Sequence, residues 1–223
     1  MISRYERQMG IFGEEGQAKL SAARVGIAGC GGLGVNVITQ LAVAGVNHYV
    51  IADGQVADIT NLNRQFIYAP YDCRPKASVS AEWILALNPL AEVEAHAEPV
   101  SVDTRAMFAQ CDVLVDCLDN MESRMVLSDL SEEMGVPLVH AGVSGTQGQI
   151  AVCIPGKTPS LRDMIGTVTD PEGPIPAVGA AVSAIAGMEA LEVLKVISGQ
   201  GSDIAGKLVT LDMGSWSMET VGF

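Results

Sequence analysis

The sequence predicts an α/β protein with a doubly wound, mostly parallel sheet and antiparallel strands at its C-terminal edge. Strand-like apolar runs alternate with helix-like segments as far as Met134, which is the pattern of a parallel sheet covered by helices. A glycine-rich turn joins the first strand to the helix after it. Of the 223 residues, 48% are hydrophobic and only 4% aromatic, which suits helices packed closely on a sheet. This length fits one domain, 1–223.

The first half of the chain predicts strand and helix alternation after an amphipathic N-terminal helix over 5–22. The apolar run RVGIAG is followed by glycines that introduce a helix. Pro75 and Lys76 begin a later helix, because proline is favoured at a helix start. The expected elements in order are a strand at 24–29, a helix at 33–44, a strand at 48–53, a helix at 75–87 and a strand within 91–100.

The second half predicts a change from parallel to antiparallel pairing. The continuous apolar run DVLVDCLD, 112–119, is typical of a buried parallel strand. Two strand-like runs, 138–143 and 149–154, flank a polar, glycine-rich turn and predict a hairpin. Residues 157–176, with four prolines, predict a mobile loop. The remaining expected elements are helices at 123–134 and 177–198 and a final strand pair at 207–213 and 216–221.

Charge and composition exclude several classes of protein. A net charge of −13 argues against a nucleic-acid surface, because phosphate backbones are held by clustered Lys and Arg. No stretch is typical of a signal peptide or a membrane span, so we expect a cytoplasmic protein. Five cysteines without a C-x-x-C pair indicate reduced thiols and no zinc site.

The glycine-rich turn predicts a nucleotide site. Gly29, Gly31 and Gly34 fit G-x-G-x-x-G between a strand and a helix, and Asp53 closes the next strand, as in Rossmann-like folds. A helix N-terminus holds the phosphates of a dinucleotide or of ATP equally well, since both use backbone N–H groups and the helix dipole. The motif alone leaves both ligands open.

The residues after Asp53 favour ATP. Asn61, Arg64 and Gln65 lie in one short turn, and Lys76 follows Arg64 by twelve residues at the start of a helix. Two cations beside a glycine loop suit a polyphosphate, whereas a nicotinamide dehydrogenase needs no such pair.

Several short motifs together resemble the MoeB/ThiF/HesA family, bacterial relatives of the ubiquitin-activating enzymes. Each motif alone is weak, but their order matches the family over nearly the whole chain. The matching stretches are RYERQ at 4–8, GCGGLG at 29–34, NLNRQ at 61–65, RPK at 74–76, DCLDN at 116–120, GQI at 148–150 and the late helix GMEALEVLKVISG.

The resemblance implies a role for each matching residue. Gly29, Gly31, Gly32 and Gly34 approach the phosphates of ATP through their backbone amides. Asp53 binds the ribose, Arg64 and Lys76 hold the phosphates, and Asn61 and Gln65 line the site. Asp119 holds Mg²⁺, which prefers one or two carboxylates with phosphate oxygens and water. Arg7, in the N-terminal helix at 1–22, reaches across a homodimer as an arginine finger.

The implied activity is adenylation of the C-terminal carboxylate of a ubiquitin-like sulfur carrier of the ThiS/MoaD type, ending in Gly-Gly. Such carriers serve thiamine or molybdopterin biosynthesis. The main alternative is adenylation of a peptide or small-molecule carboxylate by the same site. Two further alternatives are an NAD(P)-binding oxidoreductase and a non-catalytic scaffold.

The chain departs from the family in its cysteines. Ser160 and Asp163 stand where a first zinc-binding C-x-x-C pair would lie, and no cysteine follows Cys153. We therefore expect a short form without zinc and without its own sulfur-transfer thiol. Cys73 is the one cysteine expected near the nucleotide. Structural roles are expected for Asp116 and the three histidines, and packing roles for Cys30, Cys117 and Cys153.

Overall fold

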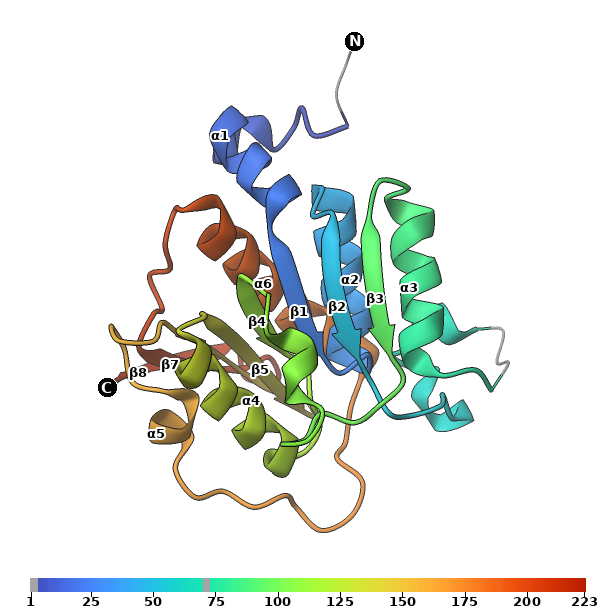
Figure 1. Ribbon diagram of the computed structural model, residues 1–223. Helices are drawn as coiled ribbons and strands as arrows, with labels where there is room; N and C mark the ends of the chain where they lie inside the picture. Colours follow the sequence, from blue (N-terminus) through green and yellow to red (C-terminus); the bar gives the residue numbers. More distant parts are fainter. Residues whose placement is uncertain (1–3, 70–72) are drawn as a thin grey trace.

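The computed structural model describes residues 4–69 and 73–223. Its strands form one eight-stranded sheet in the order β3-β2-β1-β4-β5-β6-β7-β8 (Figure 1). The parallel strands are β1 (Arg24–Ala28), β2 (His48–Ala52), β3 (Glu92–His96), β4 (Val113–Asp116) and β5 (Leu138–Ser144). The antiparallel strands are β6 (Gln147–Cys153), β7 (Lys207–Asp212) and β8 (Ser217–Gly222). The predicted sheet, with its antiparallel C-terminal edge, is confirmed.

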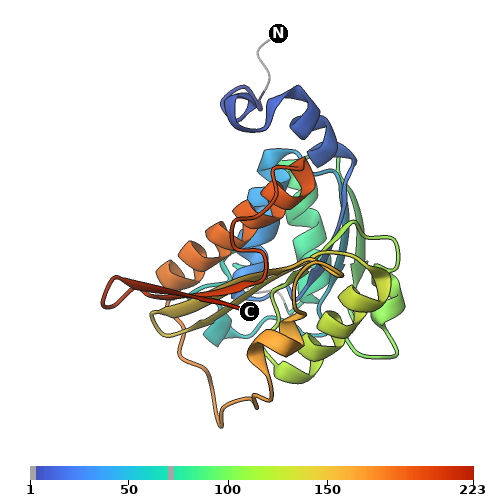
Figure 2. The ribbon, with the colours of Figure 1, turned by 90° about the vertical axis from the view of Figure 1, so that its left-hand side faces the viewer.

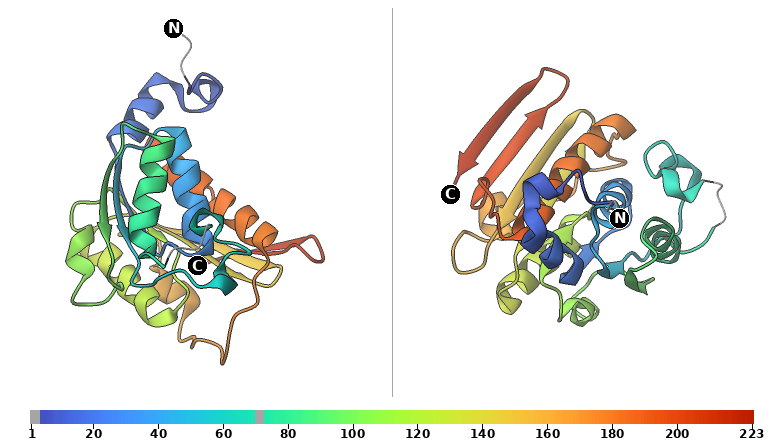
Figure 3. Two further views of the ribbon diagram at one scale, coloured as in Figure 1. Left: turned by 90° about the vertical axis from the view of Figure 1, so that its right-hand side faces the viewer. Right: turned by 90° about the horizontal axis from the view of Figure 1, so that it is seen from above.

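Helices cover both faces of the parallel part of the sheet. Helices α2 (Gly32–Ala44), α3 (Lys76–Leu87) and α6 (Gly179–Ser198) lie on one face, and α4 (Met121–Met134) and α5 (Leu161–Ile165) lie on the other (Figure 2). The two larger buried apolar clusters of the core lie on opposite sides of the sheet. The β7–β8 hairpin extends beyond the helices at the edge opposite α3 (Figure 3).

The strand order places a functional cleft at β1 and β4. Chain connections leave β1 toward β2 on one side, whereas β4 continues to β5 on the other. Loops at the carboxyl ends of β1 and β4 therefore diverge, and ligands of doubly wound sheets bind at this point. In contrast, helix α1 (Met9–Ala22) ends directly before β1 and so lies at the amino end of the strands, against α6 (Figure 1).

Aromatic contacts join the short 3-10 helices to the helix layer. Helices η1 (Ile59–Asn61) and η2 (Phe66–Tyr68) follow β2, and η3 (Arg105–Phe108) precedes β4. Phe66 packs edge-on against Trp83 of α3 with 6.4 Å between the ring centroids, and the indole N–H of Trp83 donates to Thr39 of α2 at 2.9 Å. Trp216, between β7 and β8, is 90% exposed.

Some expected boundaries were wrong. Helix α1 begins at Met9 instead of residue 5, and Gly13 interrupts it with a left-handed φ of 67°. Strand β4 ends at Asp116, three residues before the expected end, because Asn120 caps α4 by accepting from the backbone N–H of Ser123 at 2.9 Å. Asp119 therefore lies in the turn between β4 and α4 and not on the strand.

The loop expected at 157–176 contains a helix. Ser160 and Asp163 form a reciprocal capping box that begins α5 (Leu161–Ile165). After α5, residues 166–178 form an irregular segment that runs past the cleft. Within residues 4–69 and 73–223, every helix is too short or too polar to cross a bilayer.

Candidate active site

A cleft of about 1360 Å³ opens at the carboxyl ends of β1 and β4. Its walls are the glycine loop, the turn at 61–65, the start of α3, the turn between β4 and α4, and the irregular segment at 166–178. Nine of the residues predicted to bind the nucleotide or Mg²⁺ line this one cleft: Gly29, Gly31, Gly32, Asp53, Asn61, Arg64, Gln65, Lys76 and Asp119. Gly34 is the exception.

Close contacts exclude a side chain at two glycines of the loop, Gly29 and Gly34. Gly29 adopts φ 94°, and a Cβ there would lie 2.6 Å from the carbonyl oxygen of Cys117. A Cβ on Gly34 would overlap the carbonyl oxygen of Gly29, so Gly34 serves close packing of α2 under the loop. Gly31 precedes the first residue of α2, and no side chain caps this helix. The first N–H groups of α2 therefore remain donors for an anion in the cleft.

Asp53 fastens the glycine loop to the end of β2. Its carboxylate accepts from the backbone N–H of Cys30 at 2.8 Å and of Gln55 at 2.7 Å. Burial raises the pKa of the Asp53 carboxyl above its ordinary value, against the opposing influence of Lys76 and these two amide donors. Each oxygen keeps a lone pair, so Asp53 can also accept from a ribose hydroxyl.

Two cations face the loop without a carboxylate partner among the described residues. A Cβ on Gly32 would lie 3.3 Å from Cγ of Arg64, so the arginine stem lies against the loop. The Nη1 of Arg64 donates to the carbonyl of Thr60 at 3.0 Å and to Oδ1 of Asn63 at 2.7 Å. Lys76 is only 2% exposed, and its Nζ donates to Oε1 of Gln55 at 2.7 Å. A buried ammonium with a neutral partner suits an anionic ligand.

Asn61 and Gln65 play different parts in the 61–65 turn. The side-chain Oδ1 of Asn61 accepts from the backbone N–H of Asp58 at 3.1 Å in a capping box, so Asn61 shapes the turn. Gln65 is 4% exposed, and its Oε1 is buried with no partner in the part of the chain that the structure describes. Its amide lies beside Gly31, 3.8 Å from where a Cβ would stand.

Asp119 offers an exposed carboxylate to the cleft. Its Oδ1 accepts only a long 3.4 Å bond from the side chain of Asn120, and no cation pairs with it within the described ranges. A sparsely bonded carboxylate beside a phosphate cradle fits the oxygen donors that Mg²⁺ takes. No group of three or more His, Cys, Asp or Glu that could hold a metal occurs in residues 4–69 and 73–223.

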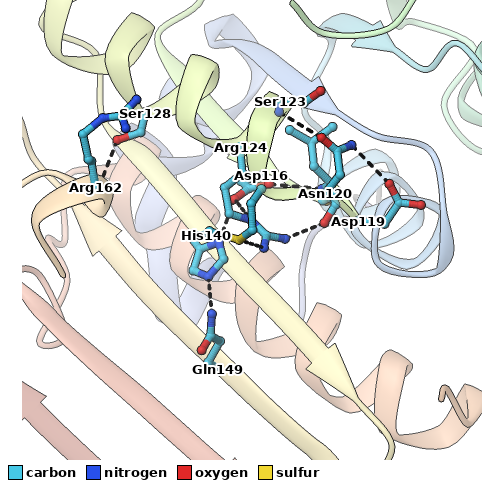
Figure 4. A network of polar contacts seen from close by, with 12 residues as sticks. Asp116, Asp119, Asn120, Ser123, Arg124, Ser128, His140, Gln149 and Arg162 are labelled. Carbon is cyan, nitrogen blue, oxygen red and sulfur yellow. Dashed lines mark hydrogen bonds and ion pairs between the residues drawn. The ribbon is translucent and has the colours of Figure 1, made fainter. Parts of the chain in front are cut away.

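A buried polar network supports the β4–α4 turn (Figure 4). Asp116 is fully buried and accepts from Nε of Arg124 at 2.8 Å and from Nδ1 of His140 at 2.7 Å. Burial lowers the pKa of His140, so the ring stays neutral, and its Nε2 accepts from the Gln149 amide at 2.9 Å. Arg124 also donates to the carbonyl of Leu118 at 2.5 Å, which fixes the turn that carries Asp119.

The structure separates two predicted residues from the cleft. Arg7 is exposed in the turn before α1, at the amino end of the strands, and does not line the cleft of its own chain. Cys73 is exposed, with φ 58°, and is not among the cleft residues. Its expected place near the nucleotide therefore has no support. Cys30, Cys117 and Cys153 are buried, and burial raises the pKa of the Cys153 thiol to about 12.

Sequence reasoning missed some contributors to the site. Gln55, whose side chain accepts the hydrogen bond from Lys76, lies in none of the sequence motifs. Asp170 accepts from the backbone N–H of Met121 at 2.9 Å, which fixes the segment at 166–178 to the start of α4 beside Asp119. The pattern N-x-x-S at Asn120, with its capping side chain, was a usable signal for the start of α4.

The fold and this cleft define a doubly wound α/β protein with a glycine loop of the nucleotide-binding type. The ThiF family model matches residues 5–222. The chain belongs to the ThiF family, as its motifs predicted.

Two relatives align over most of their own length. The chain is 32% identical to the SAMP-activating enzyme E1 of Haloferax volcanii, covering 100% of this chain and 85% of that protein. It is 34% identical to the sulfur carrier protein adenylyltransferase of Thermus thermophilus, covering 95% and 83%. Among solved structures, E. coli MccB with MccA-N7isoASN superposes with a TM-score of 0.87 over 100% of this chain and 72% of that one. At 20% identity this likeness shows the fold alone.

Proposed function

We propose that this protein adenylates the C-terminal carboxylate of a ubiquitin-like sulfur carrier of the ThiS/MoaD type, using ATP. The observation that carries the proposal is the pair of cations, Arg64 and Lys76, facing an uncapped helix N-terminus in one cleft. The names of the two relatives, which activate SAMP and a sulfur carrier protein, support the choice of acceptor. Neither cation has a use in hydride transfer to a nicotinamide.

The reaction needs positioning and charge neutralisation more than proton transfer. A carboxylate oxygen of the acceptor attacks the α-phosphorus of ATP, the bond to the bridging oxygen breaks, and pyrophosphate leaves with the electron pair. The attacking carboxylate is already ionised at neutral pH, so no general base is required. Backbone amides of α2, Arg64 and Lys76 neutralise the charge on the phosphates. Bound Mg²⁺, held by Asp119, would supply further charge neutralisation.

The acceptor reaches this site over an uncovered part of the sheet. The cleft continues over one face of the antiparallel strands, where polar side chains form its floor. Those side chains include Ser144, Gln147, Gln149 and Thr210. An extended, small-residue tail fits a polar floor of this kind, because its backbone N–H and C=O groups can be satisfied there. The cytoplasmic location and the pathway, thiamine or molybdopterin biosynthesis, stay predictions.

Exchange of labelled pyrophosphate into ATP tests the acceptor. We expect exchange when the protein is mixed with a Gly-Gly carrier from its own organism, and none when the carrier lacks its two terminal glycines. The matched control is the same carrier with a C-terminal amide, which keeps the tail but removes the nucleophile. Exchange with a small carboxylic acid and with none of the carriers supports the alternative acceptor and contradicts the proposal.

We further propose a homodimer in which Arg7 completes the partner's site. The position of Arg7 at the amino end of the strands leaves it no role in its own cleft. Complementation tests this: Arg7→Ala and Lys76→Met are each expected to be inactive in exchange. An equimolar mixture re-formed from unfolded chains should regain roughly a quarter of the wild-type activity, since one site in four combines an intact cleft with an intact Arg7. A mixture as inactive as its components contradicts the arrangement in trans.

A further inference from the structure

Three separate stretches of the chain meet the proposed phosphates, and one buried hydroxyl joins all three. The stretches are the glycine loop, the turn that carries Arg64, and the start of α3 that carries Lys76. Tyr68 lies at the end of η2, four residues after Arg64, and is only 3% exposed. Its Oη donates to the carbonyl of Cys30 at 2.5 Å and lies 3.0 Å from Oγ of Ser80.

The direction of these hydrogen bonds follows from the available protons. The tyrosine hydroxyl has one proton, and the carbonyl of Cys30 can only accept it. The hydroxyl of Ser80 must therefore donate to Oη of Tyr68. Ser80 is fully buried on α3, one turn after Lys76, so the bond connects Tyr68 to the helix that carries the ammonium.

The bond to Cys30 determines where the next amide points. The peptide between Cys30 and Gly31 is planar and trans, so its C=O and its N–H point in opposite directions. Tyr68 holds the carbonyl toward the protein interior, which directs the N–H of Gly31 away from Tyr68. Gly31 lines the cleft, whereas Tyr68 does not. On the other side of Cys30, its own N–H is held by Asp53 at 2.8 Å.

We propose that Tyr68 is a positioning residue for the phosphate loop: its hydroxyl orients the Cys30–Gly31 peptide so that the N–H of Gly31 faces the phosphates of ATP. Its contact with Ser80 fixes the position of that amide relative to Lys76 on α3. Because Tyr68 follows Arg64 by four residues, it also fixes the amide relative to the turn that carries Arg64. The inference rests on the proposed use of ATP. It adds to the ATP site a residue, Tyr68, that does not itself touch the nucleotide.

Tyr49 provides a matched control. It is fully buried on β2, and its Oη donates to the carbonyl of Val46 at 3.1 Å, at the opposite end of the strand from the cleft. Tyr68→Phe and Tyr49→Phe each remove one buried hydroxyl and its hydrogen bond to a backbone carbonyl, although the carbonyl of Val46 keeps a second donor, the side chain of Asn88 at 2.9 Å. Tyr49→Phe therefore shows what the loss of a buried tyrosine hydroxyl away from the cleft does to nucleotide binding, and thermal unfolding of both variants measures any general weakening of the fold.

Calorimetric binding of ATP and adenosine tests the inference. Tyr68→Phe is expected to weaken ATP about five- to tenfold, the effect of one misdirected hydrogen bond, and to leave adenosine within about twofold. Tyr49→Phe should leave both ligands unchanged. Ser80→Ala, which spares the bond to Cys30, should weaken ATP by less than Tyr68→Phe and serves if that variant does not fold.

Three results would overturn the inference. The first is an unchanged ATP affinity in Tyr68→Phe, and the second is an equal loss of ATP and adenosine affinity in that variant. The third is a loss of ATP affinity in Tyr49→Phe as large as that in Tyr68→Phe. If Tyr68→Phe does not fold, an unchanged ATP affinity in Ser80→Ala also overturns the inference. In each of these three results, the wild-type protein still binds ATP. Wild-type protein that binds no ATP contradicts the proposed function itself, and the inference with it, so the two failures are distinguishable.

Discussion

Lys76→Met is expected to lower the rate of ATP–pyrophosphate exchange by about 10²- to 10³-fold, the usual effect of losing one preorganised donor to a transition-state oxyanion. Methionine keeps the length and the apolar stem of lysine, which suits a position that is 2% exposed. It removes the positive charge of the first residue of α3. Arg64→Ala should have an effect of the same order, because Arg64 lies against Gly32 of the loop and lines the same cleft.

Lys19→Met is the matched control for this measurement. Lys19 lies on α1 and pairs with Glu15 at 2.7 Å, far from the carboxyl ends of the strands. The exchange rate of Lys19→Met should equal that of the wild type. Exchange in Lys76→Met or Arg64→Ala within a few-fold of the wild-type rate would show that the cleft does not hold the phosphates as proposed.

Arg124→Met is expected to destabilise the fold by about 3–5 kcal/mol, because it leaves the buried carboxylate of Asp116 without its cation. Asp116 is fully buried; burial alone would raise the pKa of its carboxyl, but Arg124 and His140 hold that pKa below its ordinary value. Urea unfolding at neutral pH measures the loss. Arg162→Met is the control: its pair with Asp129 is 2.6 Å long but half exposed, so it should cost only about 0–1 kcal/mol.

The stability gap between wild type and Arg124→Met should narrow in acid. A carboxyl whose folded pKa is lowered stabilises the fold above its unfolded pKa of about 3.9, and this contribution is lost as the pH falls through the folded value. In Arg124→Met the buried carboxyl of Asp116 has no cation and protonates more readily. Protonation removes the cost of burying an unpaired charge as the pH falls. A gap that stays constant from neutral pH to acid would mean that the charge of Asp116 does not cause the loss.

Local signals predicted the glycine loop and the sheet. Within one strand–turn–helix unit, Gly29 has a left-handed φ of 94° and Gly34 packs against the carbonyl of Gly29, so the spacing of the motif predicts the geometry of the turn. The hairpin of β5 and β6 was predicted because alternation and a glycine turn are also local. Asp119 was placed on the wrong element because the apolar run continues to Leu118, whereas the ladder with β1 ends at Asp116 and the capping of α4 sets in at Asn120.

Long-range contacts explain what the sequence did not predict. Tyr68 meets Cys30 across 38 residues, and Lys76 meets Gln55 across 21 residues. No periodicity or spacing encodes such pairs, since they depend on how η2 and α3 pack against β1 and β2. The helix α5 was different, because the capping box of Ser160 and Asp163 is a local signal, whereas the prolines of the segment had predicted a loop.

The two tryptophans give this protein a fluorescence signal with a known origin. Trp83 is partly buried on α3, the helix that begins with Lys76, and its ring contacts Phe66 directly after Gln65. Trp216 is almost fully exposed at a hairpin turn outside the cleft. A soluble quencher such as acrylamide therefore removes the emission of Trp216 first. The emission that remains comes from Trp83, an indole in contact with both cation-bearing segments, and reports their movement when a nucleotide binds.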